Sequence, residues 1–426
     1  MCHALLAGWL VLTVRADDAG PTLATSSVSE VEPGDLAAVD RDCHADDEVA
    51  AAALTSFSGG SLIRFIGLAD SAANLSVFVG KENSSPVEAI VAGSDASPAD
   101  NASVVESTSG NSACEDADLA GFAAGEQHGH ELWVVSTRGL RGASCGQCVA
   151  DFNPTVEQFI CGRGWIKSSL AEFLSTDDNA RTTAIFIHGN DTDASEAESR
   201  GRSLYRSLLT SRCDMPPTRL VIWSWPSERV IPRYRKDAQL KACRTTVEGY
   251  YLAQFIDHLG PQTPVSLGGY SYGAGVVTSG LHYLGGGTLD GRQLVERQHP
   301  DRDPANVILL GAAIANNWLL PGMRHQHALS QVERMVILFN PTDFVLHFYP
   351  RLWGGHGPEA LGATGLAAPR RLGSERAKIT QINVQPQLHR RHGWDYFSGS
   401  GAIMSLVRRE LIHLPAVTAA DGESTE

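Results

Sequence analysis

The chain has 426 residues, of which 43% are hydrophobic, so it can bury a substantial core in one large domain or in two or three smaller ones. Its formal net charge of −14 argues against a nucleic-acid partner, because phosphate binding needs clustered lysine and arginine. Eight cysteines are too few for a disulfide framework, which leaves one or two disulfides open, and no run of about 18 apolar residues predicts a transmembrane helix.

Residues 1–16 have the pattern of a secretory signal. Residues 4–14 are largely apolar, and residues 14–16 offer a cleavage site, whereas the n-region has His3 but no lysine or arginine. This pattern leaves two localisations open. The chain is exported to the periplasm or the exterior if the segment is a signal peptide, and is cytoplasmic otherwise.

The next segment, residues 17–125, is acidic and of low complexity. It holds 19 acidic and three basic residues, so it accounts for the whole net negative charge of the chain. Its few aromatic residues cannot bury enough apolar surface to offset the entropy lost on ordering. We therefore expect it to be mostly disordered, with short apolar pieces such as residues 61–69 forming a local helix or docking on the body.

Cys145 and Cys148 form a C-x-x-C pair shortly after this segment. A zinc site would need a second pair of ligands at a suitable spacing, and no such pattern follows. The pair therefore favours unpaired thiols over a local disulfide, a redox pair or a zinc site. We predict neither a metal nor a cofactor for this chain.

Residues 126–413 alternate between apolar strands and amphipathic helices, before a polar tail at residues 414–426 that we expect to be disordered. Nearly unbroken apolar runs are typical of parallel strands buried on both faces, and helices between them indicate βαβ units. The predicted strands are 131–138, 181–190, 219–226, 264–271, 306–314, 334–340 and 378–384. The predicted helices are 194–209, 238–259, 272–284 and 401–412. The sequence thus predicts a doubly wound, mostly parallel α/β sheet with helices on both faces.

A candidate nucleophile, Ser271, lies where a predicted strand meets a predicted helix. The motif Gly269-Tyr270-Ser271-Tyr272-Gly273 fits G-x-S-x-G, in which small glycines let the chain pack closely around a strained turn. The serine Oγ then projects above the sheet, and the helix N-terminus beneath it favours developing negative charge. A tight turn without catalysis is the alternative interpretation.

The loop His188-Gly189-Asn190 closes an earlier strand of the same predicted sheet. With the serine at such a turn, this loop is expected to donate one backbone N–H to the oxyanion, and the residue after the nucleophile the other. These donors would be the amides of Asn190 and Tyr272. We interpret His188 as a buried brace of the loop rather than as the base.

The acid and the base should follow the later strands of the sheet. Asp343 stands three residues after one strand, although an aspartate there could also cap a turn. His392 follows the last strand and precedes a glycine, which allows a tight loop over the site, and His389 is the alternative base. Imidazole would take the Ser271 proton while Asp343 holds its tautomer.

From about residue 132 to residue 412, the chain resembles an uncharacterised bacterial branch of the α/β-hydrolase superfamily. The resembling motifs are WVVSTR, FIHGN, VIWSWPSE, GGYSYGAG, LHYLGGG, NPTD and HGWDYF. The resemblance implies an α/β-hydrolase fold with a Ser-Asp-His triad, and the order Ser271, Asp343, His392 matches that of the fold. It implies no particular substrate.

Trp223 and Trp225 end a strand beside the predicted site, where they could line a pocket or pack under the sheet rim. Trp318–Val332 and Gly354–Gly365 are candidate lids.

From the nucleophile motif and its predicted partners, we predict a serine hydrolase that cleaves an ester or thioester of a small-molecule acyl substrate through an acyl-enzyme on Ser271. An acyltransferase on the same site and a non-catalytic binding module are the alternatives, and the sequence says nothing of oligomeric state.

Overall fold

The structure is a computed structural model that describes residues 65–66, 78–79, 112–140, 150–210, 215–355 and 357–412. The predicted signal peptide, the Cys145–Cys148 pair, the polar tail and most of the acidic segment lie outside these residues. The chain divides into two units, and the first is formed by residues 1–7 and 107–426. In the second unit, residues 8–106, β1 (Phe65–Ile66) pairs antiparallel with β2 (Phe78–Val79). The apolar piece at 61–69 thus contains a short strand rather than a helix.

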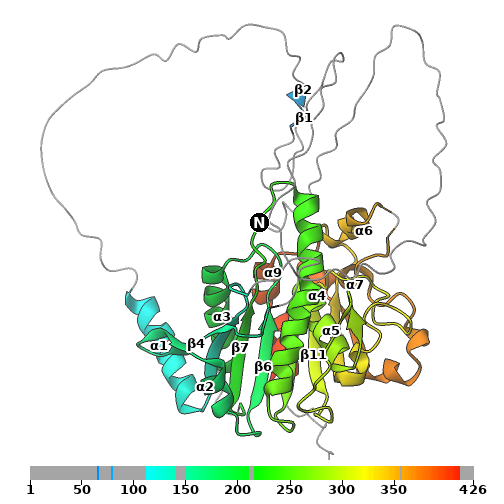
Figure 1. Cartoon of the computed structure of the whole chain (residues 1–426). Coiled ribbons are helices and arrows are strands. Elements are labelled where there is room, and N and C mark those ends of the chain that lie inside the picture. The colour runs from blue at the N-terminus through cyan, green and yellow to red at the C-terminus, as the bar shows by residue number, and fades with distance from the viewer. Residues whose placement is uncertain are drawn as a thin grey trace, which may run out of the picture. The chain divides into compact units, whose positions relative to one another are not determined.

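The first unit is built on a nine-stranded sheet (Figure 1). From one edge to the other its strands are β13 (Ile379–Asn383), β12 (Val332–Phe339), β11 (Ala305–Leu310), β8 (Val265–Tyr270), β6 (Thr182–Ile187), β7 (Thr218–Ser224), β3 (Glu131–Ser136), β4 (Thr155–Ile160) and β5 (Gly164–Ser168). The seven strands from β13 to β3 are parallel, and β4 and β5 extend the sheet antiparallel. Since parallel strands share their carboxyl ends, the loops that follow them meet at one edge of the sheet.

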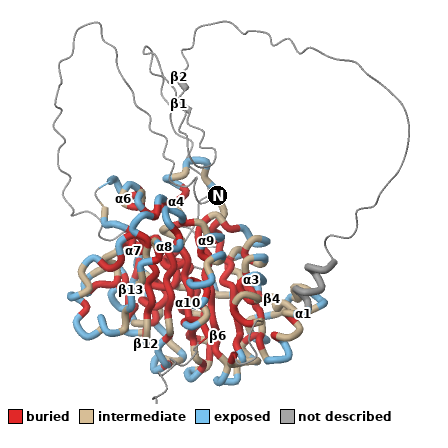
Figure 2. The backbone as a smooth tube through the Cα atoms, turned by 180° about the vertical axis from the view of Figure 1, so that it is seen from behind, coloured by how far each residue is buried: buried red, intermediate tan, exposed pale blue. Residues whose placement is uncertain are grey.

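Helices cover both faces of the sheet, and each face has its own hydrophobic core (Figures 1 and 2). One face packs against α4 (Tyr234–His258) and α5 (Gly273–Leu284). The other packs against α1 (Ser112–Gln127), α3 (Ala194–Leu209) and α10 (Gly401–Leu411). Side chains alternate along each strand, and every residue of β6 is buried, which explains its unbroken apolar run.

Shorter elements connect this framework. They are α2 (Leu170–Ser175), α6 (Tyr349–Leu352), α7 (Leu361–Thr364), α8 (Gln385–Leu388), α9 (Trp394–Ser398), the 3₁₀ helices η2 (Ala328–Gln331), η3 (Leu346–Phe348) and η4 (Pro369–Lys378), and the hairpin of β9 (Thr288–Leu289) and β10 (Arg292–Gln293). Within the described part of the chain, no helix is long and apolar enough to cross a bilayer. Cys243, on α4, is disulfide-bonded.

The predicted fold class is confirmed: the molecule has a doubly wound, mostly parallel sheet with helices on both faces. The structured body begins earlier than expected, because α1 lies partly inside the segment that we predicted to be disordered. Its Phe122 is buried and stacks on Tyr205 of α3, with ring centroids 5.0 Å apart. A single aromatic side chain thus anchors a helix whose composition of alanine, glycine and acidic residues is typical of disorder.

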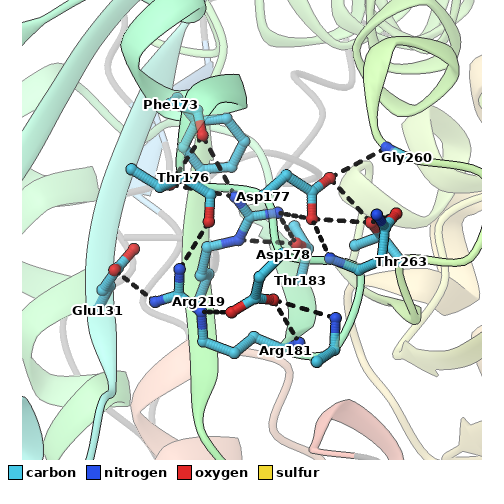
Figure 3. Close-up of polar contacts among 12 residues, drawn as sticks. Glu131, Phe173, Thr176, Asp177, Asp178, Arg181, Thr183, Arg219, Gly260 and Thr263 are labelled. Carbon is cyan, nitrogen blue, oxygen red and sulfur yellow. Dashed lines mark hydrogen bonds and ion pairs between the residues drawn. The ribbon is translucent and has the colours of Figure 1, made fainter.

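A buried ion pair connects the amino ends of the central strands (Figure 3). Arg219 of β7 is fully buried and lies 3.3 Å from Asp177, which follows α2. Its guanidinium also donates to the hydroxyl of Thr183 on β6 at 2.7 Å. Asp177 in turn accepts hydrogen bonds from the amide of Gly260 and the hydroxyl of Thr263, in the loop before β8. This network joins three neighbouring strands at the end of the sheet opposite the candidate site.

Candidate active site

Ser271 lies in a sharp turn between β8, which ends at Tyr270, and α5, which begins at Gly273. Its φ is 54°, in the left-handed region that a serine rarely adopts, so the backbone is locally strained. The amide of Ser271 donates to the carbonyl of Leu310 on β11 at 3.0 Å, which holds the turn against the neighbouring strand. The side chain is only 6% exposed.

The two glycines of the motif are required by close packing around this turn. A Cβ at Gly273 would lie 2.2 Å from the carbonyl oxygen of Ile187, at the end of β6. A Cβ at Gly269 would lie 2.8 Å from the Cα of Ala274, on the helix that follows the turn. Any side chain at either position would therefore force the turn away from its neighbours.

Three of the predicted site residues meet in one hydrogen-bonded chain. Nε2 of His392 lies 3.0 Å from Oγ of Ser271, and Nδ1 of His392 lies 2.7 Å from Oδ2 of Asp343. Asp343 and His392 are both 1% exposed. They come from the loops after β12 and β13, at the carboxyl edge of the sheet that also carries Ser271.

Asp343 is fixed by hydrogen bonds as well as by burial. Its Oδ1 accepts from the amides of Val345 and Leu346, at 2.9 and 3.0 Å, so the aspartate also caps the turn that begins η3. Its Oδ2 is left to accept from Nδ1–H of His392. This places the lone pair of the neutral imidazole on Nε2, where it can accept the Ser271 hydroxyl proton.

Tyr270, whose role the sequence did not suggest, supports His392 directly. Its hydroxyl donates to the backbone carbonyl of His392 at 2.7 Å, and its ring stacks on the imidazole with centroids 5.5 Å apart. Gly311, with φ of 52°, lies beneath the same ring, where a Cβ would be 3.3 Å from Cε1 of His392. Tyr270 stands inside the G-x-S-x-G motif, so the sequence draws attention to it. Its role could not be predicted, because its partner His392 is 122 positions away.

Asn190 and Tyr272 lie beside Ser271 in the wall of a single pocket. Neither of their backbone amides donates a hydrogen bond to another described residue, so both are available to a ligand. The side-chain amide of Asn190 is also buried, and neither its oxygen nor its nitrogen has a partner among the described residues. The backbone of Gly189 packs against the ring of Tyr270.

His188 braces the loop and does not reach Ser271. The amide of Trp225 donates to its Nε2 at 3.3 Å, so Nδ1 carries the proton and donates to the carbonyl of Gly189 at 2.9 Å. Burial, together with the charge of Arg138, lowers the pKa of His188 to about 3, so the ring is neutral. Trp225 stacks on this ring and is fully buried, as is Trp223.

His389, the alternative base, has an exposed side chain and no recorded contact with Ser271 or Asp343. Its backbone takes part in the loop: the amide donates to the carbonyl of Gln385 at 2.7 Å, and the carbonyl accepts from the side chains of Asn340 and Thr342 at 2.8 and 2.6 Å. Within the described residues, no three histidine, cysteine, aspartate or glutamate side chains gather as a metal ligand set. The geometry therefore places His392 rather than His389 at the serine.

The pocket over Ser271 is small, with a cavity volume of about 30 Å³, and its lining is largely apolar. Its lining residues are Asn190, Ala238, Ser271, Tyr272, Ala313, Val345, Leu346, Tyr349, Leu352 and His392. Part of the wall comes from η3, α6 and the residue before η3, in the segment that follows Asp343. Neither of the two segments proposed from the sequence as lids lines the pocket, nor do the two tryptophans of the WSWP motif.

No family model and no curated protein matches the sequence. Among solved structures, acyl-protein thioesterase 2 of Zea mays has a TM-score of 0.31 at 11% identity, over 54% of this chain and 92% of that one. Esterase B of Lactobacillus rhamnosis, in an inhibited form, has a TM-score of 0.32 at 12% identity, over 70% of this chain and 96% of that one. Likeness at this level says nothing about activity.

Proposed function

We propose that this protein is a serine hydrolase that cleaves a carboxylic ester or thioester through an acyl-enzyme on Ser271. The observation that carries the proposal is the continuous chain from Asp343 through His392 to Ser271, buried at the mouth of an apolar pocket. A serine hydroxyl becomes a nucleophile when an adjacent base accepts its proton and a third group orients that base.

In the first half of the reaction, Oγ of Ser271 attacks the substrate carbonyl carbon while its proton moves to Nε2 of His392. The carbonyl oxygen becomes an oxyanion, which accepts hydrogen bonds from the amides of Asn190 and Tyr272. His392, now charged, is stabilised by Asp343 at 2.7 Å. The bond to the leaving group then breaks, His392 gives its proton to the departing oxygen or sulfur, and an ester of Ser271 is left.

In the second half, water takes the place of the leaving group. His392 accepts a proton from the water as its oxygen attacks the acyl carbon, and the same amides hold the second oxyanion. The bond to Oγ breaks, the proton returns to Ser271, and the carboxylic acid leaves. The apolar lining supports an aliphatic acyl group as the part that enters the pocket.

A fluorophosphonate probe tests the proposal, because it reacts with a serine only when that serine is activated. We expect the wild type to be labelled and Ser271→Ala to remain unlabelled. Ser405→Ala, which removes an exposed serine of α10, is the matched control and should be labelled like the wild type. Equal labelling of Ser271→Ala and wild type would overturn the assignment, as would a folded wild type that takes no label.

A further inference from the structure

Three segments that contain or adjoin lining residues of the pocket carry exposed basic side chains. They come from residues 229–236, which lead into α4, from residues 344–353, which contain η3 and α6, and from residues 389–396 around His392. We call the exposed lysine and arginine residues of these ranges the cationic rim. Its members are Arg229, Arg233, Arg235, Lys236, Arg351, Arg390 and Arg391. Asp395 is the one acidic residue in the three ranges, within a chain whose net charge is −14.

Direct contacts join the three segments around the pocket. Arg235 donates to the carbonyl of Leu352 at 3.3 Å, and the amide of Phe344 donates to the carbonyl of Arg390 at 3.2 Å. Leu352 and His392 themselves line the pocket. In Figures 1 and 2, the start of α4, α6 and α9 all lie at the same end of the sheet. The rim is therefore continuous with the wall over Ser271.

The cations of the rim lack the partners that other arginines of the protein have. Elsewhere in the described chain Arg324 pairs with Asp290 at 3.0 Å and Arg334 with Glu410 at 2.7 Å. No member of the rim forms an ion pair with a described residue. Their positive charge is left available to a ligand.

Four members of the rim lie instead over aromatic rings, which hold their guanidinium groups in place. Arg229 lies 3.8 Å from the ring centroid of Tyr234, and Arg351 lies 4.7 Å from that of Phe348. The remaining two pairs are Arg390 with Phe344 at 5.8 Å and Arg391 with Tyr396 at 5.0 Å. A guanidinium stacked on a ring keeps its N–H edge free for a carboxylate or phosphate. Arg391, whose Nη1 donates to the hydroxyl of Tyr396 at 2.8 Å, keeps its other N–H groups for such a ligand.

We propose that the substrate is an ester or thioester whose leaving portion carries an anionic group, a carboxylate or a phosphate, that binds the cationic rim. The inference rests on the proposed function, since it needs the acyl group in the apolar pocket and the scissile carbonyl at Ser271. The leaving portion then points out of the pocket mouth, where the rim lies. Clustered unpaired charge beside a low-dielectric pocket raises the local concentration of an oppositely charged substrate and its association rate.

A matched pair of esters tests this inference. Both carry a butyryl group, one on 3-hydroxybenzoate and one on 3-hydroxybenzamide, so they differ mainly in the charge of the leaving portion. Each kcat/KM is divided by the rate of uncatalysed hydrolysis, which removes the difference in intrinsic reactivity. We expect a ratio of about ten or more in favour of the benzoate at low ionic strength, falling toward one as salt is raised to about 1 M. The same ester of 3-hydroxyphenyl phosphate shows whether the rim prefers phosphate to carboxylate.

Substitutions in the cationic rim test whether its arginines cause the preference for the charged ester. Arg390→Gln combined with Arg391→Gln should reduce the ratio several-fold. Arg370→Gln combined with Arg376→Gln, on η4 and away from the rim, is the matched control and should leave the ratio unchanged. A ratio near one that does not respond to salt, with both esters hydrolysed, would overturn this inference alone. Failure to hydrolyse either ester, together with failure of fluorophosphonate labelling, would overturn the proposed function and this inference with it.

Discussion

The side chain of Asn190 is a buried polar group beside Ser271 that has no hydrogen-bond partner among the described residues. Both of its amide atoms are buried in the pocket wall, and neither is hydrogen-bonded to a described residue. A buried polar group without a partner costs free energy, so its presence in the pocket wall beside Ser271 supports a contact with a ligand. The side chain can donate from Nδ2 and accept at Oδ1, in addition to the backbone amide that we assign to the oxyanion.

We predict that Asn190→Ala lowers kcat/KM about tenfold, the loss expected for one hydrogen bond to the reacting ester. The backbone amide stays in place, so fluorophosphonate labelling should persist at a reduced rate. The melting temperature should not fall, because no intramolecular hydrogen bond of the side chain is lost. Asn153→Ala, in the exposed loop before β4, is the control. Unchanged kinetics in Asn190→Ala would assign the side chain no part in binding.

Among the elements of the fold, the sheet is stabilised at one end and carries the candidate site at the other. Arg219 and Asp177 join β7 to the segment after α2, and Asp177 also holds the loop before β8. The side chains of Arg219 and Asp177 are both buried, so each charge is neutralised by the other rather than by water. Removing one partner leaves a buried charge unpaired, which costs far more than removing an exposed ion pair.

We predict that Arg219→Met lowers the free energy of unfolding by about 3–5 kcal/mol, measured by urea denaturation. Asp290→Asn removes the charge of the exposed pair with Arg324 and keeps a side chain that tolerates the positive φ of 50° at this turn, so it should cost at most about 1 kcal/mol. Below their melting temperatures, both variants should keep the wild-type kcat/KM. A loss in Arg219→Met no larger than that in Asp290→Asn would show that the buried pair does not hold the strands together.

The elements most accurately predicted from the sequence are those with a strong local signal. Helix α3 has the predicted bounds, because Asp193 caps its first turn and apolar residues recur on one face. The buried parallel strands were visible as apolar runs. The hairpin of β4 and β5 was missed, since most of its residues are only half-buried and their pattern does not alternate clearly.

The meeting of Ser271, Asp343 and His392 could also be predicted, because each follows a strand whose carboxyl end lies at the same edge. Their catalytic roles remain a proposal. The support from Tyr270 and the shape of the pocket could not be predicted, because they depend on contacts between segments far apart in the sequence. The same holds for the cationic rim. More than 100 residues separate its first segment, 229–236, from its second, 344–353, so the segments meet only in the folded chain.

For the whole molecule, buried ionisable groups make stability depend on pH. Burial raises the pKa of Glu248 on α4 to about 7, even though the hydroxyl of Thr137 and the indole of Trp223 donate to it. The folded state therefore binds more protons than the unfolded state between about pH 4.5 and 7, and this carboxyl lowers stability as pH rises through that window. His188, whose pKa is lowered from 6.5 to about 3, acts in the opposite direction: it adds stability as pH rises from about 3 to about 6.5.

We predict that the wild type loses stability relative to Glu248→Gln as pH is raised from about 5 to about 7, because the glutamine has no proton to release. Denaturation curves at several pH values measure the difference in the free energy of unfolding. Glu333→Gln, at an exposed position of β12, should show a difference from wild type that does not vary with pH over this range. A pH-independent difference for Glu248→Gln would mean that the buried carboxyl does not titrate there.

We propose that Ser271 carries the acyl group during turnover, and mass spectrometry of the quenched enzyme can detect that group on the serine itself. The protein is mixed with excess 4-nitrophenyl butyrate, stopped with acid during turnover and digested. We predict one butyryl group on the peptide that contains Ser271, none on the corresponding peptide of Ser271→Ala, and loss of turnover in that variant. Ester turnover that persists in Ser271→Ala, or a butyryl group found on another residue instead, would contradict the assignment of Ser271 as the nucleophile.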